Sequence, residues 1–129
     1  MARILVVDDN PSVRTTIRLM LESDGHSLIL VENGHDGARA IEAEPIDLLI
    51  VDVFMPEMDG FELIQFVRKR NPDLPIIAIS GSEAAPDFLA MARSFGAVRS
   101  IRKPFRPADL RDALRDCLID RSPGGAVRH

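Results

Sequence analysis

The sequence predicts an α/β protein in which a parallel sheet of five strands carries helices on both faces. Two observations lead to this class. Short aliphatic runs alternate with stretches of helical spacing, five times over. The aliphatic runs also lack the apolar–polar alternation of a half-exposed strand, which indicates strands buried on both faces. Strands that alternate with helices in this way form parallel sheets between helical layers.

The five predicted strands are short and rich in Val, Ile and Leu, the residues that suit a covered sheet. They cover residues 4–7, 28–31, 48–51, 76–79 and 98–101. The last of these is the weakest, because its apolar run is interrupted by Arg99 and Ser100.

The helices are predicted between the strands by apolar residues three and four positions apart. They cover residues 12–23, 35–43, 60–70, 86–95 and 107–119. In the first helix, Val13, Ile17, Met20 and Leu21 form one stripe. Gly96 follows the fourth helix, where a glycine commonly ends a helix.

Length and composition predict one globular domain. The chain has 129 residues, of which 46% are hydrophobic and 28% charged, and this balance is typical of a folded protein. We expect a domain over residues 1–121 and a short flexible tail over 122–129, where Gly and Pro replace the apolar pattern. A single Cys excludes an internal disulfide and a Cys-based zinc site.

Charge and hydropathy bear on location and partners. The net charge is −4, and the chain has neither Trp nor Tyr, which argues against direct nucleic-acid binding. No apolar run approaches the roughly 18 residues of a membrane span. The first apolar run holds only residues 4–7, which is too short for a secretory signal. We therefore expect a cytoplasmic protein without a membrane partner.

Polar side chains stand where the strands end. Glu32 and Asn33 follow the second strand, at the far side of the first, and the polar residues of the other four strands are candidates for one shared site. Asp8 and Asp9 follow the first strand, Asp52 the third, Ser80 the fourth and Lys103 the fifth. Ligands of open parallel sheets bind at the carboxyl ends of the strands, so we expect these side chains to converge.

A cluster of this kind needs a positive counter-charge. Two carboxylates about 4 Å apart repel each other by roughly 4 kcal/mol at an effective dielectric constant of about 20. Lys103 can neutralise one acid, and a hard divalent cation such as Mg²⁺ can neutralise the others. Beside such a cation, a carboxylate can serve as both a ligand and a nucleophile.

The same residues resemble a known family, the receiver domain of two-component response regulators, of the kind found in chemotaxis. The resemblance is carried by Val6–Asp9, Asp52–Gly60, Ser80–Gly81 and Lys103–Phe105, and it covers residues 3 to about 119. It implies a flavodoxin-like, doubly wound sheet with strand order 2-1-3-4-5 and five helices. In this interpretation the chain is a stand-alone receiver.

The resemblance also implies roles for the acidic residues. Asp52 corresponds to the phosphoacceptor, and Asp9 to a direct Mg²⁺ ligand. Asp8 corresponds to a second acid that positions metal-bound water, and the backbone carbonyl of Phe54 would complete the metal shell together with Asp52.

Two further residues correspond to the family's switch machinery, and one departs from it. Ser80 corresponds to the hydroxyl that follows the phosphoryl group. Lys103 corresponds to the lysine that pairs with Asp52 and then with a phosphoryl oxygen, and its bond to Pro104 is cis in the family. Ser100 stands where most receivers carry an aromatic residue, three positions before the lysine. We therefore expect the signal to leave by another shift, in the loop after Ser80 or in the fourth helix.

The implied function is that of a phosphoacceptor switch rather than an enzyme. Its phosphoryl donor would be a histidine kinase or a histidine phosphotransfer protein, and its output a protein contact or a phosphorelay. The face formed by the fourth helix, fifth strand and fifth helix is the candidate surface for a downstream protein partner. The sequence has a run of basic residues here, Arg93, Arg99, Arg102, Lys103 and Arg106, and all of them except Lys103 lie on this face in the family. These cations form either a docking surface for an acidic partner or an ordinary solvated face.

Two other functions, a small phosphatase and an FMN-binding protein, fit the sequence less well. A small phosphatase with an aspartyl nucleophile usually places its second acid two residues after the first, whereas Asp8 and Asp9 are adjacent. An FMN-binding protein needs a Ser, Thr or Gly phosphate loop after the first strand, where this chain has acids. Taken alone, the Asp8–Asp9 pair could also simply end a strand and cap the next helix.

Overall fold

The computed structural model describes residues 2–53, 60–81, 90, 93–94 and 99–121. Its elements follow in the order β1 (Arg3–Val7), α1 (Pro11–Ser23), β2 (Ser27–Val31), α2 (Gly34–Ala43), β3 (Leu48–Asp52), α3 (Gly60–Arg70), β4 (Ile76–Ser80), β5 (Arg99–Arg102) and α5 (Pro107–Arg121). The five predicted strands are confirmed, each within one residue of its expected bounds. The predicted fourth helix, 86–95, lies largely outside the described residues, as does the predicted tail, 122–129.

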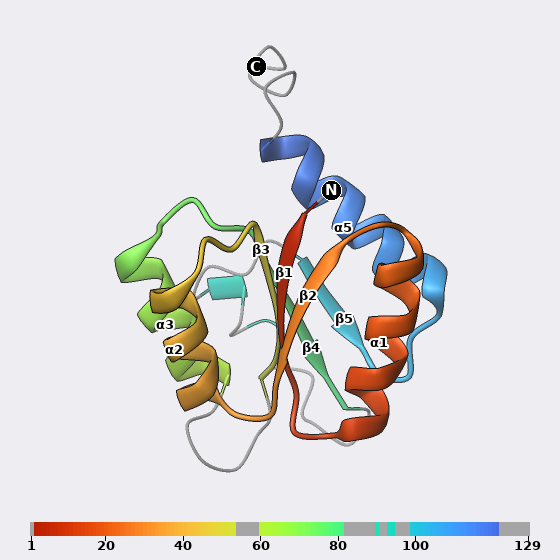
Figure 1. The fold of residues 1–129 in the computed structure, drawn as a ribbon, viewed down its shortest axis with the longest axis horizontal. Helices are drawn as coiled ribbons and strands as arrows, with labels where there is room; N and C mark the ends of the chain where they lie inside the picture. The colour runs from red at the N-terminus through yellow and green to blue at the C-terminus, as the bar shows by residue number, and fades with distance from the viewer. Residues whose placement is uncertain (1, 54–59, 82–89, 91–92, 95–98, 122–129) are drawn as a thin grey trace.

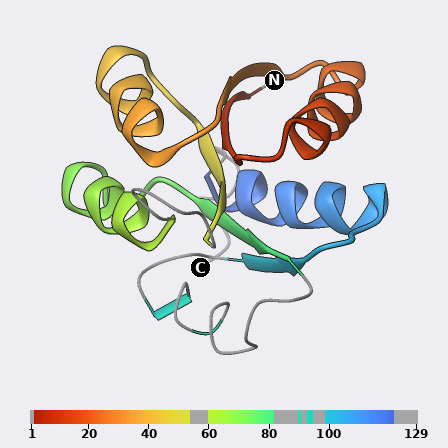
Figure 2. The same ribbon diagram turned by 90° about the horizontal axis from the view of Figure 1, so that it is seen from below.

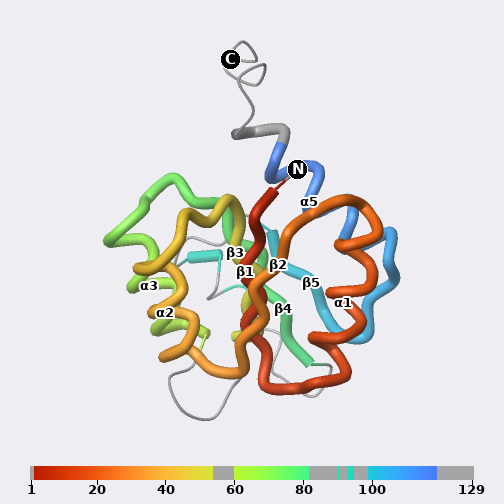
Figure 3. The backbone as a smooth tube through the Cα atoms, in the orientation of Figure 1, coloured from red at the N-terminus to blue at the C-terminus, as the bar shows by residue number. Residues whose placement is uncertain are grey.

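All five strands pair in parallel, in the order β2-β1-β3-β4-β5. This is the doubly wound order that the family resemblance implied. The helices α2 and α3 lie against one face of the sheet, and α1 and α5 lie against the other (Figures 1 and 2). The strand β1 lies between β2 and β3, and β3 is the central strand of the sheet (Figure 3). The chain order therefore reverses between β1 and β3.

The sheet has a core on each face, and alternate residues of each strand belong to each core. Leu49 and Val51 of β3 pack on the α2–α3 side, whereas Leu48 and Ile50 pack on the α1–α5 side. Every residue of β3 and β4 is buried. This double burial explains why these strands read as unbroken aliphatic runs in the sequence.

The starts of α1 and α2 are fixed by asparagine caps. The Asn10 side chain accepts hydrogen bonds from the backbone N–H groups of Ser12 and Val13 at the start of α1. The Asn33 side chain accepts one from Asp36 N–H at the start of α2. Asn10, not the acidic pair before it, therefore caps α1, and Asp8 and Asp9 need another explanation. Within the described residues, no helix is long and apolar enough to cross a bilayer.

Candidate functional site

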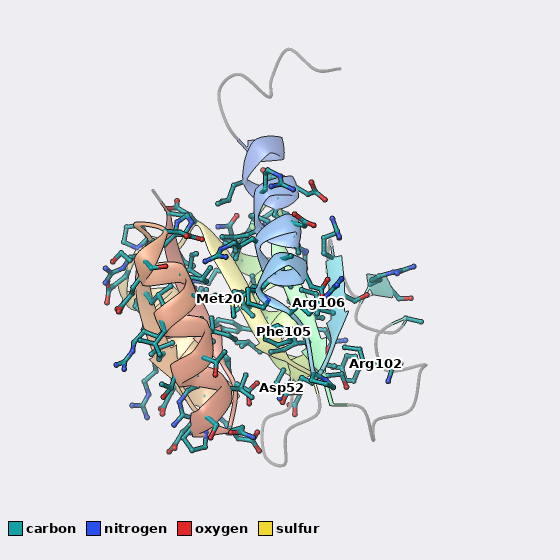
Figure 4. All side chains as sticks on the ribbon, turned by 90° about the vertical axis from the view of Figure 1, so that its right-hand side faces the viewer. Met20, Asp52, Arg102, Phe105 and Arg106 are labelled. Atoms are coloured by element: carbon teal, nitrogen blue, oxygen red, sulfur yellow. The ribbon has the colours of Figure 1, made fainter. Side chains whose placement is uncertain are left out.

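Three acids meet where the chain order reverses. Asp8 and Asp9 follow β1, and Asp52 is the last residue of the neighbouring β3. One carboxylate oxygen from each of the three lies within 4.8 Å of the others. Figure 4 shows Asp52 at the end of the sheet, with Arg102 at the corresponding end of β5. The predicted convergence of the strand ends is thus present in the structure.

The adjacent acids Asp8 and Asp9 have different surroundings. Asp8 is fully buried. Its Oδ1 accepts a hydrogen bond from Asn10 N–H at 2.9 Å, and its Oδ2 lies 2.9 Å from Lys103 Nζ. Asp9, by contrast, is exposed to solvent. Both Asp8 oxygens are therefore engaged by protein groups, whereas the Asp9 carboxylate is open to an incoming cation.

Lys103 neutralises part of this cluster. Its Nζ lies 3.0 Å from Asp52 Oδ2 as well as 2.9 Å from Asp8 Oδ2. Its backbone N–H donates to the Ser80 carbonyl at 2.7 Å, which fixes the end of β5 against the end of β4. The Lys103–Pro104 peptide bond is cis, as the resemblance implied.

The pKa of Lys103 reflects two opposing effects. Burial lowers the pKa, but the hydrogen bonds and charges of Asp8 and Asp52 outweigh burial and raise it above the ordinary lysine value. The side chain therefore stays protonated at neutral pH and acts as a fixed positive charge.

The cluster still carries an excess of negative charge. Three carboxylates face one lysine ammonium, and two of the carboxylates, those of Asp8 and Asp52, are almost completely buried. Oxygen ligands in this arrangement suit Mg²⁺, a hard cation that binds through one or two carboxylates. All three carboxylates could reach one ion, and Asp9 is the one that is open to solvent.

Ser80 brings a hydroxyl group to the same edge. It is the last residue of β4 and is fully buried. Within the part of the chain that the structure describes, its Oγ has no hydrogen-bond partner. An unpartnered buried hydroxyl is costly, so a ligand oxygen would supply the partner that Ser80 lacks.

Of the two other predicted site residues, the structure describes only Ser100. Phe54, whose backbone carbonyl was expected in the metal shell, lies outside the described residues. Ser100 is half-buried in β5 and pairs in register with Ala78 of β4. It therefore lies one step along the ladder from the Ile79–Ile101 pair and two steps from the Ser80–Arg102 pair.

Sequence reasoning missed two residues that shape the site. Asn10 donates its backbone N–H to Asp8, and Arg14 donates from Nη1 to the Asp8 backbone carbonyl at 2.6 Å. A signal for Arg14 was present, because a cation in the first turn of a helix opposes the helix dipole. Such a residue points to a partner outside its own helix.

The basic face is less positive than its sequence indicated. Arg99 forms an ion pair with Asp116, and Arg106 pairs with Asp109 at 3.2 Å. Both acids belong to α5, so the fold places negative charge against the basic run. Arg93 and Arg102 are exposed.

The fold and this edge define a class of protein: a doubly wound α/β domain with an acidic, lysine-paired site at its topological switch point. The sequence profile of the response regulator receiver domain matches residues 4–115, and the chain belongs to this family. Receiver domains are the phosphoacceptor signalling domains of two-component systems. Membership favours this interpretation over the phosphatase and flavin-binding alternatives.

Individual relatives agree with the family assignment. The transcriptional regulatory protein GlrR of Escherichia coli K12 is 34% identical over 122 residues, which are 95% of this chain but 27% of GlrR. The chain thus spans about a quarter of that regulator's length. An uncharacterized 14.6 kDa protein of Leptolyngbya boryana is 41% identical over 109 residues, covering 83% of this chain and 82% of that protein.

Solved structures show the same architecture. A receiver domain from Clostridium thermocellum superposes with a TM-score of 0.87 at 28% identity, covering 94% of this chain and 97% of that one. The receiver domain of the sensor histidine kinase PA1611 from Pseudomonas aeruginosa has a TM-score of 0.81 at 29% identity, covering 91% and 97%. That structure holds a magnesium ion in its active-site cleft.

Proposed function

We propose that this protein is a Mg²⁺-dependent phosphoacceptor switch that takes a phosphoryl group on Asp52 from a histidine kinase or a histidine phosphotransfer protein. Its output is contact with a downstream protein or onward transfer of the phosphoryl group. The observation that carries the proposal is the cluster of Asp8, Asp9 and Asp52 around Lys103 at the switch point of the sheet. We also propose a receiver domain over residues 1–121, a location in the cytoplasm, and a downstream protein partner on the face formed by the fourth helix, β5 and α5.

The transfer step uses the side chains at this edge. An Asp52 carboxylate oxygen forms a bond to phosphorus while the phosphorus–nitrogen bond of the donor histidine breaks, and the electron pair of that bond returns to the imidazole. Mg²⁺, held by Asp9 and Asp52 with the Phe54 carbonyl, would neutralise charge on the phosphoryl group.

Asp8, Lys103 and Ser80 support the product. Lys103 leaves the Asp52 carboxylate and pairs with a phosphoryl oxygen, while Asp8 keeps the ammonium near the site. The Ser80 hydroxyl donates a hydrogen bond to a second phosphoryl oxygen. The added charge and acceptor oxygens then favour a new arrangement of the loops around the site.

The proposal predicts a phosphoryl adduct that depends on both Mg²⁺ and Asp52. The protein would be incubated with acetyl phosphate and Mg²⁺, and its intact mass compared with that of Asp52→Asn. We expect one phosphoryl group on the native protein, none on Asp52→Asn and none when EDTA replaces Mg²⁺. Asp112→Asn, which changes an exposed acid of α5, is the matched control and is expected to react normally.

Two outcomes would contradict the proposal. One is an adduct of equal yield on Asp52→Asn, which would place the acceptor elsewhere. The other is a native protein that stays unmodified both by acetyl phosphate and by a panel of phosphorylated histidine kinases and phosphotransfer proteins.

Replacing Ser80 separates its role toward the phosphoryl group from its role in the fold. The Oγ atom has no partner in the described structure, so Ser80→Ala is expected to change the free energy of unfolding by less than about 1 kcal/mol. The rate of adduct formation should nevertheless fall, because a donor to the phosphoryl oxygen is lost. Urea unfolding and timed intact-mass measurements test both points, with the exposed Ser12→Ala as control. A rate equal to that of the native protein would remove Ser80 from the site.

A further inference from the structure

Arg14 occupies a position that its own helix does not favour. It lies in the first turn of α1, which contains no acidic residue, and a cation there opposes the positive end of the helix dipole. Its side chain is half-buried, and Nη1 donates to the Asp8 backbone carbonyl at 2.6 Å. The structural reason for this arginine is thus found in the β1–α1 turn, not in the helix.

The carbonyl that Arg14 contacts belongs to the peptide that joins Asp8 to Asp9. Among the residues that the structure describes, the Asp9 carboxylate accepts no hydrogen bond, so its direction depends on its backbone. Asp8 N–H donates to the Val31 carbonyl at 3.2 Å, and Asn10 N–H donates to Asp8 Oδ1 at 2.9 Å. Arg14 adds a third hydrogen bond, on the peptide that precedes Asp9, whereas the Asn10 N–H belongs to the peptide that follows it.

We propose that Arg14 is a positioning residue for the cation site, which holds the Asp8–Asp9 peptide so that the exposed Asp9 carboxylate stays beside Asp52. This inference rests on the proposed function, because it concerns the same Mg²⁺ site. A second possible effect of Arg14 has the opposite sign. Through charge alone, a guanidinium near the acidic cluster would repel a divalent cation and weaken its binding. Measurement of Mg²⁺ affinity therefore distinguishes positioning from simple charge.

The experiment is a calorimetric titration of Mg²⁺ alone into the metal-free protein. Because residues that orient ligands typically contribute 10- to 100-fold to metal affinity, Arg14→Ala is expected to weaken Mg²⁺ binding about tenfold. Arg14→Met, which keeps a long side chain but has neither donor nor charge, should behave similarly. Arg14→Lys retains a donor and the charge and should recover most of the affinity. Arg18→Ala, one turn further along α1 and exposed, is the control and should match the native protein.

A second measurement needs no metal. Amide hydrogen exchange at Asn10, whose N–H donates to Asp8 Oδ1, is expected to be faster in Arg14→Ala than in the native protein and unchanged in Arg18→Ala. Urea midpoints for each variant show whether a change in exchange is local to the β1–α1 turn or reflects global unfolding.

The outcomes separate this inference from the proposed function. Tighter or unchanged Mg²⁺ binding in both Arg14→Ala and Arg14→Met, beside a native protein that binds Mg²⁺ and forms the Asp52 adduct, overturns the positioning role alone. A native protein that neither binds Mg²⁺ nor forms the adduct overturns the proposed function and this inference with it. Weaker binding in both neutral variants, recovered in Arg14→Lys, supports the inference.

Discussion

Gly60→Ala is expected to destabilise the protein by about 3 kcal/mol or more, because the first turn of α3 lies directly against the end of β3. A Cβ atom on Gly60 would lie 2.5 Å from Val53 Cα and closer still to the Asp52 backbone oxygen. These are backbone atoms, which cannot rotate away. Either α3 moves outward or the strand that carries the proposed phosphoacceptor shifts.

Gly37→Ala provides a matched comparison. The nearest atoms to the added Cβ would be side-chain methyl groups of Leu63 and Val7, at 3.0 Å, which need to give way by only a few tenths of an ångström. Since alanine also favours the helix interior, we expect a change within about 1 kcal/mol. Urea unfolding of both variants tests the contrast. Similar midpoints for Gly60→Ala and the native protein would show that the α3–β3 contact is looser than the structure indicates.

Lys103→Met is expected to destabilise the metal-free protein by about 3 kcal/mol, because it leaves two buried carboxylates without their counter-charge. Asp8 is fully buried and Asp52 is 3% exposed. For the same reason, Mg²⁺ should stabilise this variant more than it stabilises the native protein. Urea unfolding with EDTA and with Mg²⁺ measures both effects, and Lys69→Met, which changes an exposed lysine of α3, is the control.

The stability that Lys103 contributes has a definite pH dependence. Its pKa is raised in the folded protein above the value of 10.5 in the absence of interactions: burial lowers it, but the contacts with Asp8 and Asp52 raise it more. The contribution is therefore fully present below pH 10.5 and is lost as the pH rises through the higher, folded-state pKa. The stability difference between native protein and Lys103→Met should be constant from pH 7 to 9 and shrink only in strong alkali. A difference that already fell between pH 7 and 9 would contradict this assignment.

The sequence alone predicted most of the architecture. Strands that are buried on both faces, such as β3 and β4, appear in the sequence as unbroken aliphatic runs. Amphipathic helices appear as apolar residues three and four positions apart, because only one helix face is buried. Parallel pairing then requires that Asp9, Asp52 and Lys103 end at the same edge. The strand order itself came from the family resemblance, since periodicity does not tell which strands are neighbours.

Only the tertiary structure showed how the surroundings of the two adjacent acids differ. Asp8 and Asp9 are equivalent in composition and nearly so in position, yet one is enclosed by Lys103 and Asn10 while the other faces solvent. The same holds for the contact of Arg14 with the Asp8 carbonyl and for the pairing of Arg99 with Asp116. Each of these contacts joins side chains or turns whose approach is set by the packing of whole elements.

There is a physical reason why the sequence predicts the architecture but not the individual contacts at the site. Secondary structure and the direction of each strand follow from local propensity and from a hydrophobic pattern that repeats along the chain, so the sequence determines which residues arrive at the functional edge. Which side chains pair at that edge depends on contacts such as the 2.9 Å approach of Lys103 Nζ to Asp8 Oδ2, between residues that are far apart in the sequence. The distances between these side chains are set by how the helices pack on both faces of the sheet, and they cannot be predicted from a local sequence pattern.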